Sequence, residues 1–306
     1  MSPVRSCDAA VLRALAQRDV QLVIAVQPAS VDGVAGLIGR ARAAGVGVAL
    51  WPMLHDADGR WANASNAELY ERWVYALLEE LARDDAAPDE LCMDLEPPLA
   101  QLRKLIDRRV AAVAIPGDRE AAVVALQRVI DHASALGIAS WATVIPFVLA
   151  DDPERATWQR LMGTPVDALP LAQVCTMLYS TLAVGYTRGL LQRRHADALL
   201  WECSQRARAR FGARASIALG AIGKGALGDE AVYRDVDELR RDVAIAKGAG
   251  ITDLALFELG GALARPPLEP WLDALCDTPA ITDAPPTSLR VRALLGALDR
   301  VGARKR

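Results

Sequence analysis

Short apolar runs alternate along the chain with longer segments in which apolar residues recur at helical spacing. This alternation is typical of repeated strand–helix units that build a parallel sheet. The runs are apolar on both faces, which indicates strands that meet other side chains on both sides. The pattern predicts seven strands, over Gln21–Val26, Gly47–Leu54, Leu91–Glu96, Ile138–Pro146, Gln173–Ser180, Ala215–Gly220 and Asp253–Leu259.

The segments between these runs predict helices. The main ones are expected over Val31–Ala44, Ala67–Arg83, Arg119–Leu136, Gly189–Phe211 and Asp237–Lys247. Strands that alternate with helices in this way favour an α/β fold, a (β/α)8 barrel of the TIM type, which takes roughly 250 residues. The chain has 306 residues, which is long enough for that barrel.

The first strand of the barrel is apparently missing or truncated. A helix is predicted over Cys7–Arg18, and only MSPVRS precedes it. In an eight-stranded barrel this helix follows strand one, so that strand is absent, improvised from Met1–Arg5, or lost to a start annotated too late. We expect the resulting open seam to be shielded by the C-terminal helix or a second chain, because an open strand edge exposes backbone groups.

Three regions are expected: a single barrel over residues 1–276, a Pro-rich linker over 277–287, and a C-terminal helix with a basic tail over 288–306. Apolar residues recur at helical spacing in the last region, which favours a helix packed on the barrel exterior or over its N-terminal mouth. A partner-binding helix is the alternative. If the protein forms a homo-oligomer, the open seam and this helix are the expected contact surfaces.

Composition excludes several classes of function. Apolar residues make up 52% of the chain and the net charge is −3, so no nucleic-acid partner is expected. No apolar run reaches the roughly 18 residues of a membrane span, and the charged N-terminus lacks the core of a signal peptide. As written, the protein is predicted to be cytoplasmic. A secreted or periplasmic location is left open if the true start lies upstream. Five widely spaced cysteines favour reduced thiols.

A strand with two carboxylates carries the strongest functional signal. Alternation along the strand places Cys92, Asp94 and Glu96 on one face. The opposite face is apolar and must meet the helices, so the carboxylates point into the barrel, where burial is costly unless they are paired or used. Pro97 and Pro98 end the strand and place Glu96 at the C-terminal rim, where barrel enzymes keep their sites. An internal network that merely pins a loop is the alternative.

Aromatic residues near the same rim suit a sugar, because their faces stack on sugar rings. Trp51 and Trp141 fall on predicted strands, and Trp61 falls in a loop. For Trp141, packing in the core is an equal alternative. His55 follows a strand, but the other two histidines fall in predicted helices, so no metal is expected. We expect no cofactor either, since Gly220–Gly225 lacks phosphate-loop spacing.

Three segments together resemble the family 18 glycoside hydrolases, the chitinase-like barrels. Asp89, Asp94 and Glu96 match the DxxDxDxE signature, with Cys92 at its second Asp. The residues TMLYS at 176–180 resemble MxY[DN], and LALFELGG at 254–261 resembles the segment that usually carries a Trp under the sugar. The resemblance is a pattern over about residues 20 to 275, and it rests on the order of the three segments.

The resemblance implies a retaining, substrate-assisted glycosidase. Glu96 would protonate the leaving oxygen, while Asp94 would orient a substrate acetamido group that attacks as an internal nucleophile. Tyr179 would hydrogen-bond that group. The residues expected to bind the substrate are Trp51, Trp61, Trp141, Met177, Phe257, Glu258 and His55.

Departures from the family pattern leave other functions open. Cys92 cannot share a proton as Asp does, Ser180 replaces Asp or Asn, and Phe257 replaces Trp. The SxGG segment is absent, so chitin itself is not the expected substrate. A non-catalytic carbohydrate-binding barrel and a muramidase-like enzyme that uses Asp94 and Glu96 are the alternatives. In each case the expected partner is a carbohydrate or another small molecule.

Overall fold

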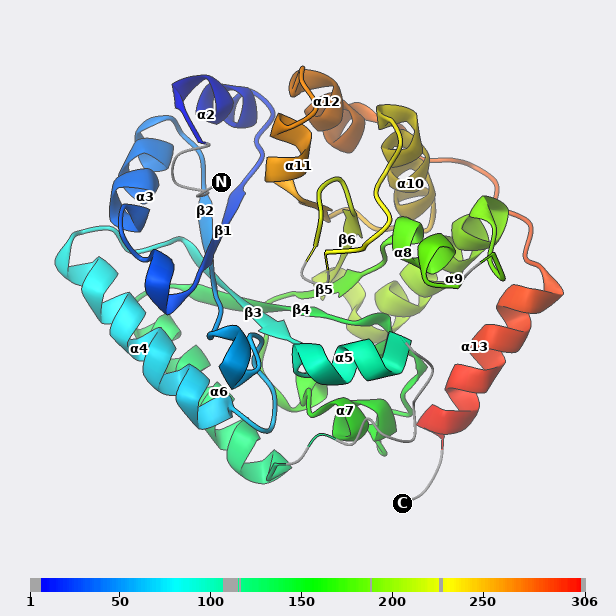
Figure 1. The fold of residues 1–306 in the computed structure, drawn as a ribbon, viewed down its shortest axis with the longest axis horizontal. Coiled ribbons are helices and arrows are strands. Elements are labelled where there is room, and N and C mark those ends of the chain that lie inside the picture. The colour runs from blue at the N-terminus through cyan, green and yellow to red at the C-terminus, as the bar shows by residue number, and fades with distance from the viewer. Residues whose placement is uncertain (1–6, 107–114, 116, 188, 226–227, 304–306) are drawn as a thin grey trace. The chain divides into compact units, whose positions relative to one another are not determined.

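The computed structural model describes residues 7–106, 115, 117–187, 189–225 and 228–303 (Figure 1). The segment Met1–Arg5, the proposed substitute for a first strand, and the last residues of the basic tail lie outside the described residues. The chain forms two compact units. The first comprises Met1–Thr143 and Gln159–Ala172, and the second comprises Val144–Trp158 and Gln173–Arg306.

The first unit holds four strands in chain order: β1 (Leu22–Val26), β2 (Val48–Pro52), β3 (Glu90–Leu95) and β4 (Ala139–Val144). β1 pairs with β2, and β2 with β3, in parallel. Its helices are α2 (Ala9–Ala16), α3 (Val34–Ala43), α4 (Ala67–Arg83), α5 (Leu99–Ile106), α6 (Arg119–Ala135) and most of α7 (Thr157–Met162), with the short turns η1 (Pro28–Ser30), η2 (Asp56–Asp58) and η5 (Val166–Ala168).

Helix α4 shows why these segments fold as they do. Its buried side chains include Tyr70, Val74, Leu77 and Leu81, which recur every three or four residues and form one apolar stripe. α4 packs against α6 in the same unit. Asp89 fixes the start of the neighbouring strands, because its carboxylate accepts the N–H of Val48 at 2.7 Å. The first Asp of the carboxylate signature thus serves strand register.

The second unit holds three strands, β5 (Val174–Met177), β6 (Ala215–Gly220) and β7 (Leu254–Phe257), which pair in parallel and in chain order. Its helices are α8 (Ser180–Gly185), α9 (Arg193–Phe211), α10 (Val236–Gly248), α11 (Leu259–Leu263), α12 (Glu269–Asp277) and α13 (Leu289–Gly302), with the turns η4 (Pro146–Ala150) and η6 (Gly212–Arg214).

All seven predicted strands are confirmed, and the α/β fold of the (β/α)-barrel class is confirmed with them. Within residues 7–21, which the structure describes, no strand precedes β1, as the early helix at Cys7–Arg18 predicted. The predicted strands are somewhat too long; Gly47–Leu54, for example, shortens to Val48–Pro52. The division into one barrel, a linker and a tail stays a prediction.

The expectation that every strand is covered on both faces is wrong for β1 and β7. Val23 on β1 is 36% exposed, and all four residues of β7 are only half-buried. Both are terminal strands in the order of the described sheet, so among the described residues each has a neighbouring strand on one side only. An apolar run in the sequence does not distinguish such a strand from a central one.

The C-terminal helix α13 is firmly packed in the second unit. It contacts α9 and η4 and buries Val291 and Leu295. The indole N–H of Trp158 donates to the carbonyl of Leu298 at 3.0 Å. This packing on another helix agrees with one of the two predicted placements, whereas shielding of the open seam stays a prediction. In the described part of the chain, no helix combines the length and apolar character that crossing a bilayer requires.

We predict that two glycines of α13 respond oppositely to alanine. A Cβ at Gly302 would overlap the carbonyl oxygen of Ala150, whereas nothing lies within 4 Å of a Cβ at Gly296. Gly302→Ala should lower the free energy of unfolding by about 1–3 kcal/mol, since overpacking displaces backbone. Gly296→Ala should raise it by about 0.5–1 kcal/mol through helix propensity. Urea unfolding measures both, and equal effects would contradict the packing of α13.

Candidate functional site

The carboxylate pair lies at the C-terminal end of β3. Asp94 is on the strand and Glu96 follows its last residue. Only 2% of Asp94 and 6% of Glu96 is exposed, so both carboxyl groups are removed from water. An isolated buried carboxylate is costly, and its neighbours therefore determine its state.

Asp94 is held by both strands that flank β3. The hydroxyl of Thr143, on β4, donates to Asp94 Oδ1 at 2.7 Å. Trp51, on β2, lies close enough to lower the pKa of the same carboxyl group. Both neighbours favour the charged form of Asp94.

The two carboxyl groups share a proton near neutral pH. Burial raises the pKa of Asp94 to about 7, although hydrogen bonds from Thr143 and Glu96 lower it. Burial, and then the charge of Asp94, raise the pKa of Glu96 well above its usual range. Because two adjacent buried carboxylates cannot both ionise cheaply, Glu96 keeps the proton and donates it in a hydrogen bond to Asp94. The pair then holds an acid beside an anion.

The segment that follows β2, residues 55–66, docks on the end of β3; we call it the rim segment. The N–H of Ala62 donates to the carbonyl of Asp94 at 2.9 Å, and Ala62 pairs with Leu95 in a parallel bridge. The side-chain amide of Asn63, which is fully buried, donates to the carbonyl of Glu96 at 3.2 Å. The rim segment therefore fixes the backbone that carries both carboxyl groups.

A second asparagine closes the rim segment on itself. Asn66 accepts the N–H of Asn63 at 2.9 Å and donates to the carbonyls of Asp58 and Trp61 at 2.9 and 2.8 Å. Sequence reasoning missed both asparagines. The available signal was the run NASN after a strand, because Asn side chains readily bond to nearby backbone.

Arg60 is a third residue that the sequence interpretation missed. Its guanidinium forms a two-pronged ion pair with Asp56, at 2.8 Å for both contacts. It also lies 5.8 Å from the centre of the Trp61 ring. Its charge lowers the pKa of Asp94 and of Glu96, against the larger effect of burial. No sequence pattern marks such a residue, since arginines are common on this chain.

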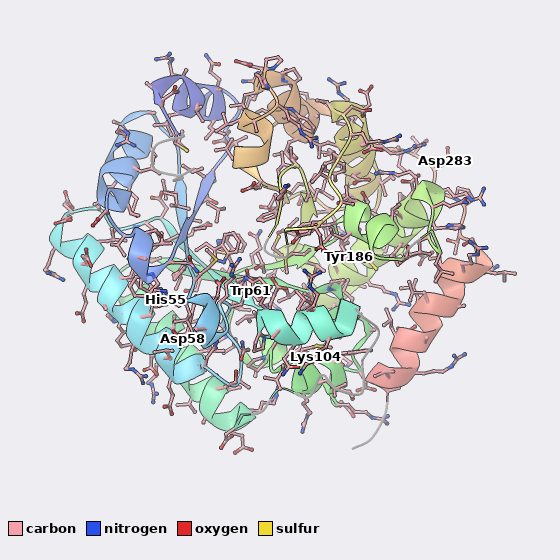
Figure 2. All side chains as sticks on the ribbon, viewed as in Figure 1. His55, Asp58, Trp61, Lys104, Tyr186 and Asp283 are labelled. Carbon is pink, nitrogen blue, oxygen red and sulfur yellow. The ribbon has the colours of Figure 1, made fainter. Side chains whose placement is uncertain are left out.

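The predicted aromatic residues of the first unit differ in exposure. Trp51 is half-buried, while only 4% of Trp61 and 6% of Trp141 is exposed. Trp61 and the exposed His55 both belong to the rim segment (Figure 2). The indole N–H of Trp141 is buried and has no acceptor among the described residues. Trp51 is thus the aromatic residue in contact with the pair, and Trp61 is mainly covered.

The other predicted site residues belong to the second unit. Tyr179 follows β5 and stacks on Phe257 at the end of β7, with ring centres 5.6 Å apart. Met177 ends β5 and is half-buried. Glu258 precedes α11; burial raises the pKa of its carboxyl, while the backbone N–H of Gly261 lowers it. Their predicted roles toward a substrate stay predictions.

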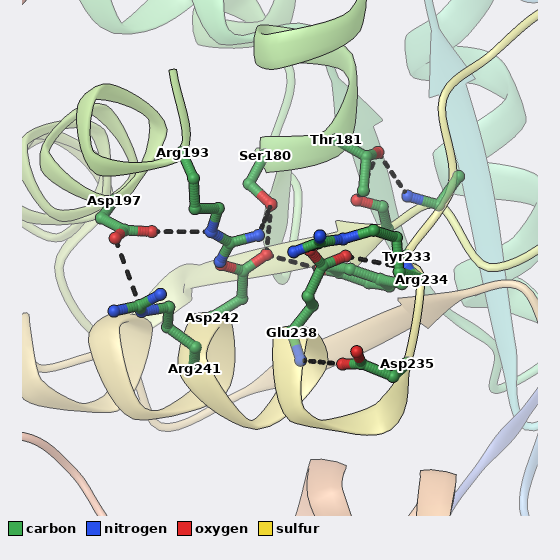
Figure 3. A network of polar contacts seen from close by, with 12 residues as sticks. Ser180, Thr181, Arg193, Asp197, Tyr233, Arg234, Asp235, Glu238, Arg241 and Asp242 are labelled. Carbon is green, nitrogen blue, oxygen red and sulfur yellow. Dashed lines mark hydrogen bonds and ion pairs between the residues drawn. The ribbon is translucent and has the colours of Figure 1, made fainter. Parts of the chain in front are cut away.

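Ser180 has a structural partner that explains the departure from the family pattern. Its hydroxyl donates to the fully buried Asp242 on α10 at 2.5 Å, and the hydroxyl of Tyr233 donates to the same oxygen at 2.6 Å (Figure 3). Arg193 on α9 forms an ion pair with Asp242 and another with Asp197, the latter at 2.9 Å. Ser180 therefore fastens α8 to α9 and α10.

Among the described residues, the cysteines form no disulfide and no metal-binding cluster is found. All five cysteines lie in the described part of the chain and form no disulfide, which confirms the reduced thiols predicted. Among the described residues, no three His, Cys, Asp or Glu side chains gather as a metal-binding group.

No protein-family model matches the chain, and no curated protein matches it in sequence. Solved structures do match it. The glycoside hydrolase domain of PgaB (BpsB) from Bordetella bronchiseptica superposes with a TM-score of 0.54 at 11% identity, covering 92% of this chain and 97% of that one. A GH5-4 broad specificity endoglucanase from Ruminococcus champanellensis, with bound cellotriose, gives 0.52 at 12%, covering 90% of each chain. The likeness is one of fold. The chain therefore has the barrel fold that these glycoside hydrolases use.

We predict that the native protein exposes one reactive thiol, Cys276. This residue is half-buried, whereas Cys92 and the other three cysteines are buried. A thiol reagent should therefore label Cys276 quickly and Cys92 only on unfolding, because access limits the reaction. Mass spectrometry of the labelled peptides measures the order, and Cys276→Ser is the control that should remove the fast label. Fast labelling of Cys92 in the native protein would contradict its burial.

We predict that Glu96→Gln stabilises the protein increasingly as pH rises. The pKa values of the pair are raised in the folded state, so the folded protein binds more protons than the unfolded chain. The contribution of the raised pKa values to folding stability is fully present below about pH 4, and it is lost as the pH rises through about 7 and beyond. Gln removes the second ionisation, so the difference in melting temperature between variant and wild type should grow from pH 5 to pH 8. A constant difference would show that the pair does not share a proton.

Proposed function

We propose that this chain is a retaining glycoside hydrolase that acts on an N-acetylated oligosaccharide by a substrate-assisted mechanism. The observation that carries the proposal is the pair of buried carboxyl groups, Asp94 and Glu96, at the C-terminal end of β3, where burial favours a proton on Glu96. A general acid must hold its proton near neutral pH, and the raised pKa of Glu96 meets that need. The resemblance to family 18 at this strand adds the reaction type.

In the proposed first step, Glu96 transfers its proton to the glycosidic oxygen as the bond from that oxygen to the anomeric carbon breaks. The carbonyl oxygen of the substrate acetamido group forms the new bond to the anomeric carbon. Positive charge then develops on the acetamido group, and the anion of Asp94, which accepts a hydrogen bond from Thr143, stabilises it. In the second step, water attacks the anomeric carbon as the bond from that carbon to the acetamido oxygen breaks. The attacking water gives a proton to Glu96, and the configuration is retained.

The fold supports a carbohydrate substrate. The PgaB domain and the GH5-4 endoglucanase are glycoside hydrolases on the same type of barrel, although their likeness to this chain reaches the fold alone. One further feature favours a sugar: the half-buried Trp51 lies near the pair, and an aromatic face can stack on a sugar ring.

We predict that Glu96→Gln and Asp94→Asn each lower turnover of an N-acetylated oligosaccharide by about 10²-fold or more, the scale for losing a general acid or its partner. Both variants keep the side-chain volume; Gln removes the acidic proton of Glu96 and Asn removes the charge of Asp94, so both should fold. Turnover of aryl N-acetylglycosides, ligand affinity and melting temperature are measured together. The control is Glu68→Gln, an exposed residue on α4 that should change none of them.

The alternatives give different results in the same assay. Binding of oligosaccharides without turnover by the wild type would indicate a carbohydrate-binding barrel. Turnover that does not need the N-acetyl group at the cleaved sugar would indicate a muramidase-like mechanism. If Glu96→Gln unfolds the protein and Asp94→Asn leaves turnover unchanged, the pair is a structural network and the glycosidase proposal is wrong.

A further inference from the structure

We propose that Arg60, aimed by Asp56, is a positioning residue that keeps the Asp94–Glu96 pair at a single negative charge. The inference deepens the proposed function, since it assigns a residue that prepares the acid, but it concerns the pair itself and can be tested without a substrate. It begins from the way in which the rim segment holds Arg60.

The side chain of Arg60 is fixed in direction. Two nitrogen atoms, Nε and Nη2, donate to the two oxygens of Asp56 at 2.8 Å each, which is the fork geometry that orients a guanidinium group. The Arg60 side chain is 21% exposed, while that of Asp56 is 56% exposed. Asp56 therefore lies on the solvent side of the ion pair, and Arg60 lies on the protein side.

The backbone at Arg60 is fixed as well. Its φ is 62°, a left-handed conformation that side-chain-bearing residues rarely adopt. The carbonyl of Arg60 accepts the N–H of Leu54 at 2.8 Å, and its own N–H donates to the carbonyl of His55 at 3.2 Å. These bonds close the turn, so the position of Arg60 does not depend on its ion pair alone.

The rim segment then ties Arg60 to the carboxylates. Two residues after it, Ala62 bonds to the backbone of Asp94, and Asn63 bonds to the backbone of Glu96. The guanidinium of Arg60 lies over the ring of Trp61, the residue between Arg60 and Ala62. Because the charge is held on a segment docked to the pair, it acts on both carboxyl groups, and its effect favours their anionic forms.

The described surroundings of the pair in the first unit supply few charges. β2 contributes Trp51, β4 contributes Thr143, and α4 contributes the buried Tyr70, all uncharged near neutral pH. Cys92 lies on β3 itself. The rim segment contributes Arg60, its ion-pair partner Asp56 and the exposed His55. Arg60 is thus the cation among these groups that offsets the charge of Asp94.

A single positive charge at this place has a definite effect. Burial would favour the neutral form of both carboxyls, and without Arg60 only the uncharged neighbours of Asp94, chiefly Thr143 and Glu96, would support its anion. Arg60 adds a charge that stabilises the first ionisation, while the cost of a second adjacent anion still keeps the proton on Glu96. The result is one acid and one anion rather than two neutral acids.

The experiment compares Arg60→Met with Arg128→Met. Arg128 forms the same two-pronged pair with Glu71, at 2.7 and 2.8 Å, between α6 and α4. Thermal unfolding is followed from pH 4 to pH 9 for the wild type and both variants. Without Arg60 the pKa values of the pair rise further, so the folded protein holds its protons to higher pH. The melting temperature of Arg60→Met should therefore fall more between pH 5 and pH 8 than that of the wild type. The melting temperature of Arg128→Met should change with pH as that of the wild type does.

Two further variants isolate the cause. In a background with both Asp94→Asn and Glu96→Gln, the pH-dependent part of the Arg60→Met effect should vanish, because no carboxyl of the pair remains to titrate. Arg60→Lys keeps the positive charge and should retain most of the wild-type pH profile of melting temperature. If Arg60→Met does not fold, Arg60→Lys is the variant that is compared with the wild type. An Arg60→Met profile that parallels the wild type, or one that persists in the double-variant background, would overturn the inference.

Activity provides a separate measurement. If the proposed substrate is turned over, Arg60→Met should shift the pH dependence of kcat/KM to higher pH, in the direction of the thermal shift. The absence of turnover would count against the proposed function only, because the thermal profiles test Arg60 by themselves.

Discussion

The cost of burying two carboxyl groups at the end of one strand governs the first unit. β3 carries both groups away from water, and nothing in the strand itself can neutralise them. The neighbouring strand β4 therefore supplies a hydroxyl donor, and the rim segment supplies a cation and two hydrogen bonds to the backbone of residues 94 and 96. These features are separate in the sequence, but they have one physical effect. Together they stabilise a buried pair that carries one proton and one negative charge.

The second unit solves the same problem differently. Asp242 is fully buried too, but Arg193, which also pairs with Asp197, forms an ion pair with it, and the hydroxyls of Ser180 and Tyr233 donate to the same carboxylate. A carboxylate that is paired with arginine and fully hydrogen-bonded carries no proton and has no free acceptor position. Its role is therefore to hold helices together. A carboxylate that is balanced by a shared proton remains available for chemistry. Burial alone does not distinguish the two cases, whereas the identity of the partner does.

The sequence predicted the fold far better than it predicted the surroundings of the carboxylates. Strand–helix alternation located all seven strands, and alternation within β3 placed Asp94 and Glu96 on one face. Both signals are local and periodic. Asn63 bonds to a backbone carbonyl 33 positions away in the chain, and Arg60 adopts a left-handed backbone conformation. No periodic pattern in the sequence encodes either feature. The prediction that Trp61 lies in a loop and binds the substrate did not foresee its burial, for the same reason.

The rim segment grips the carbonyl oxygens of residues 94 and 96, and it makes these bonds regardless of which side chains project from those residues. Support and chemistry are therefore carried by different atoms of the same two residues. A lineage could exchange the side chains at these positions, and so lose or alter a reaction, without loosening the loop that frames them. Such a scaffold tolerates substitution of the two carboxyl side chains without losing the segment that frames them.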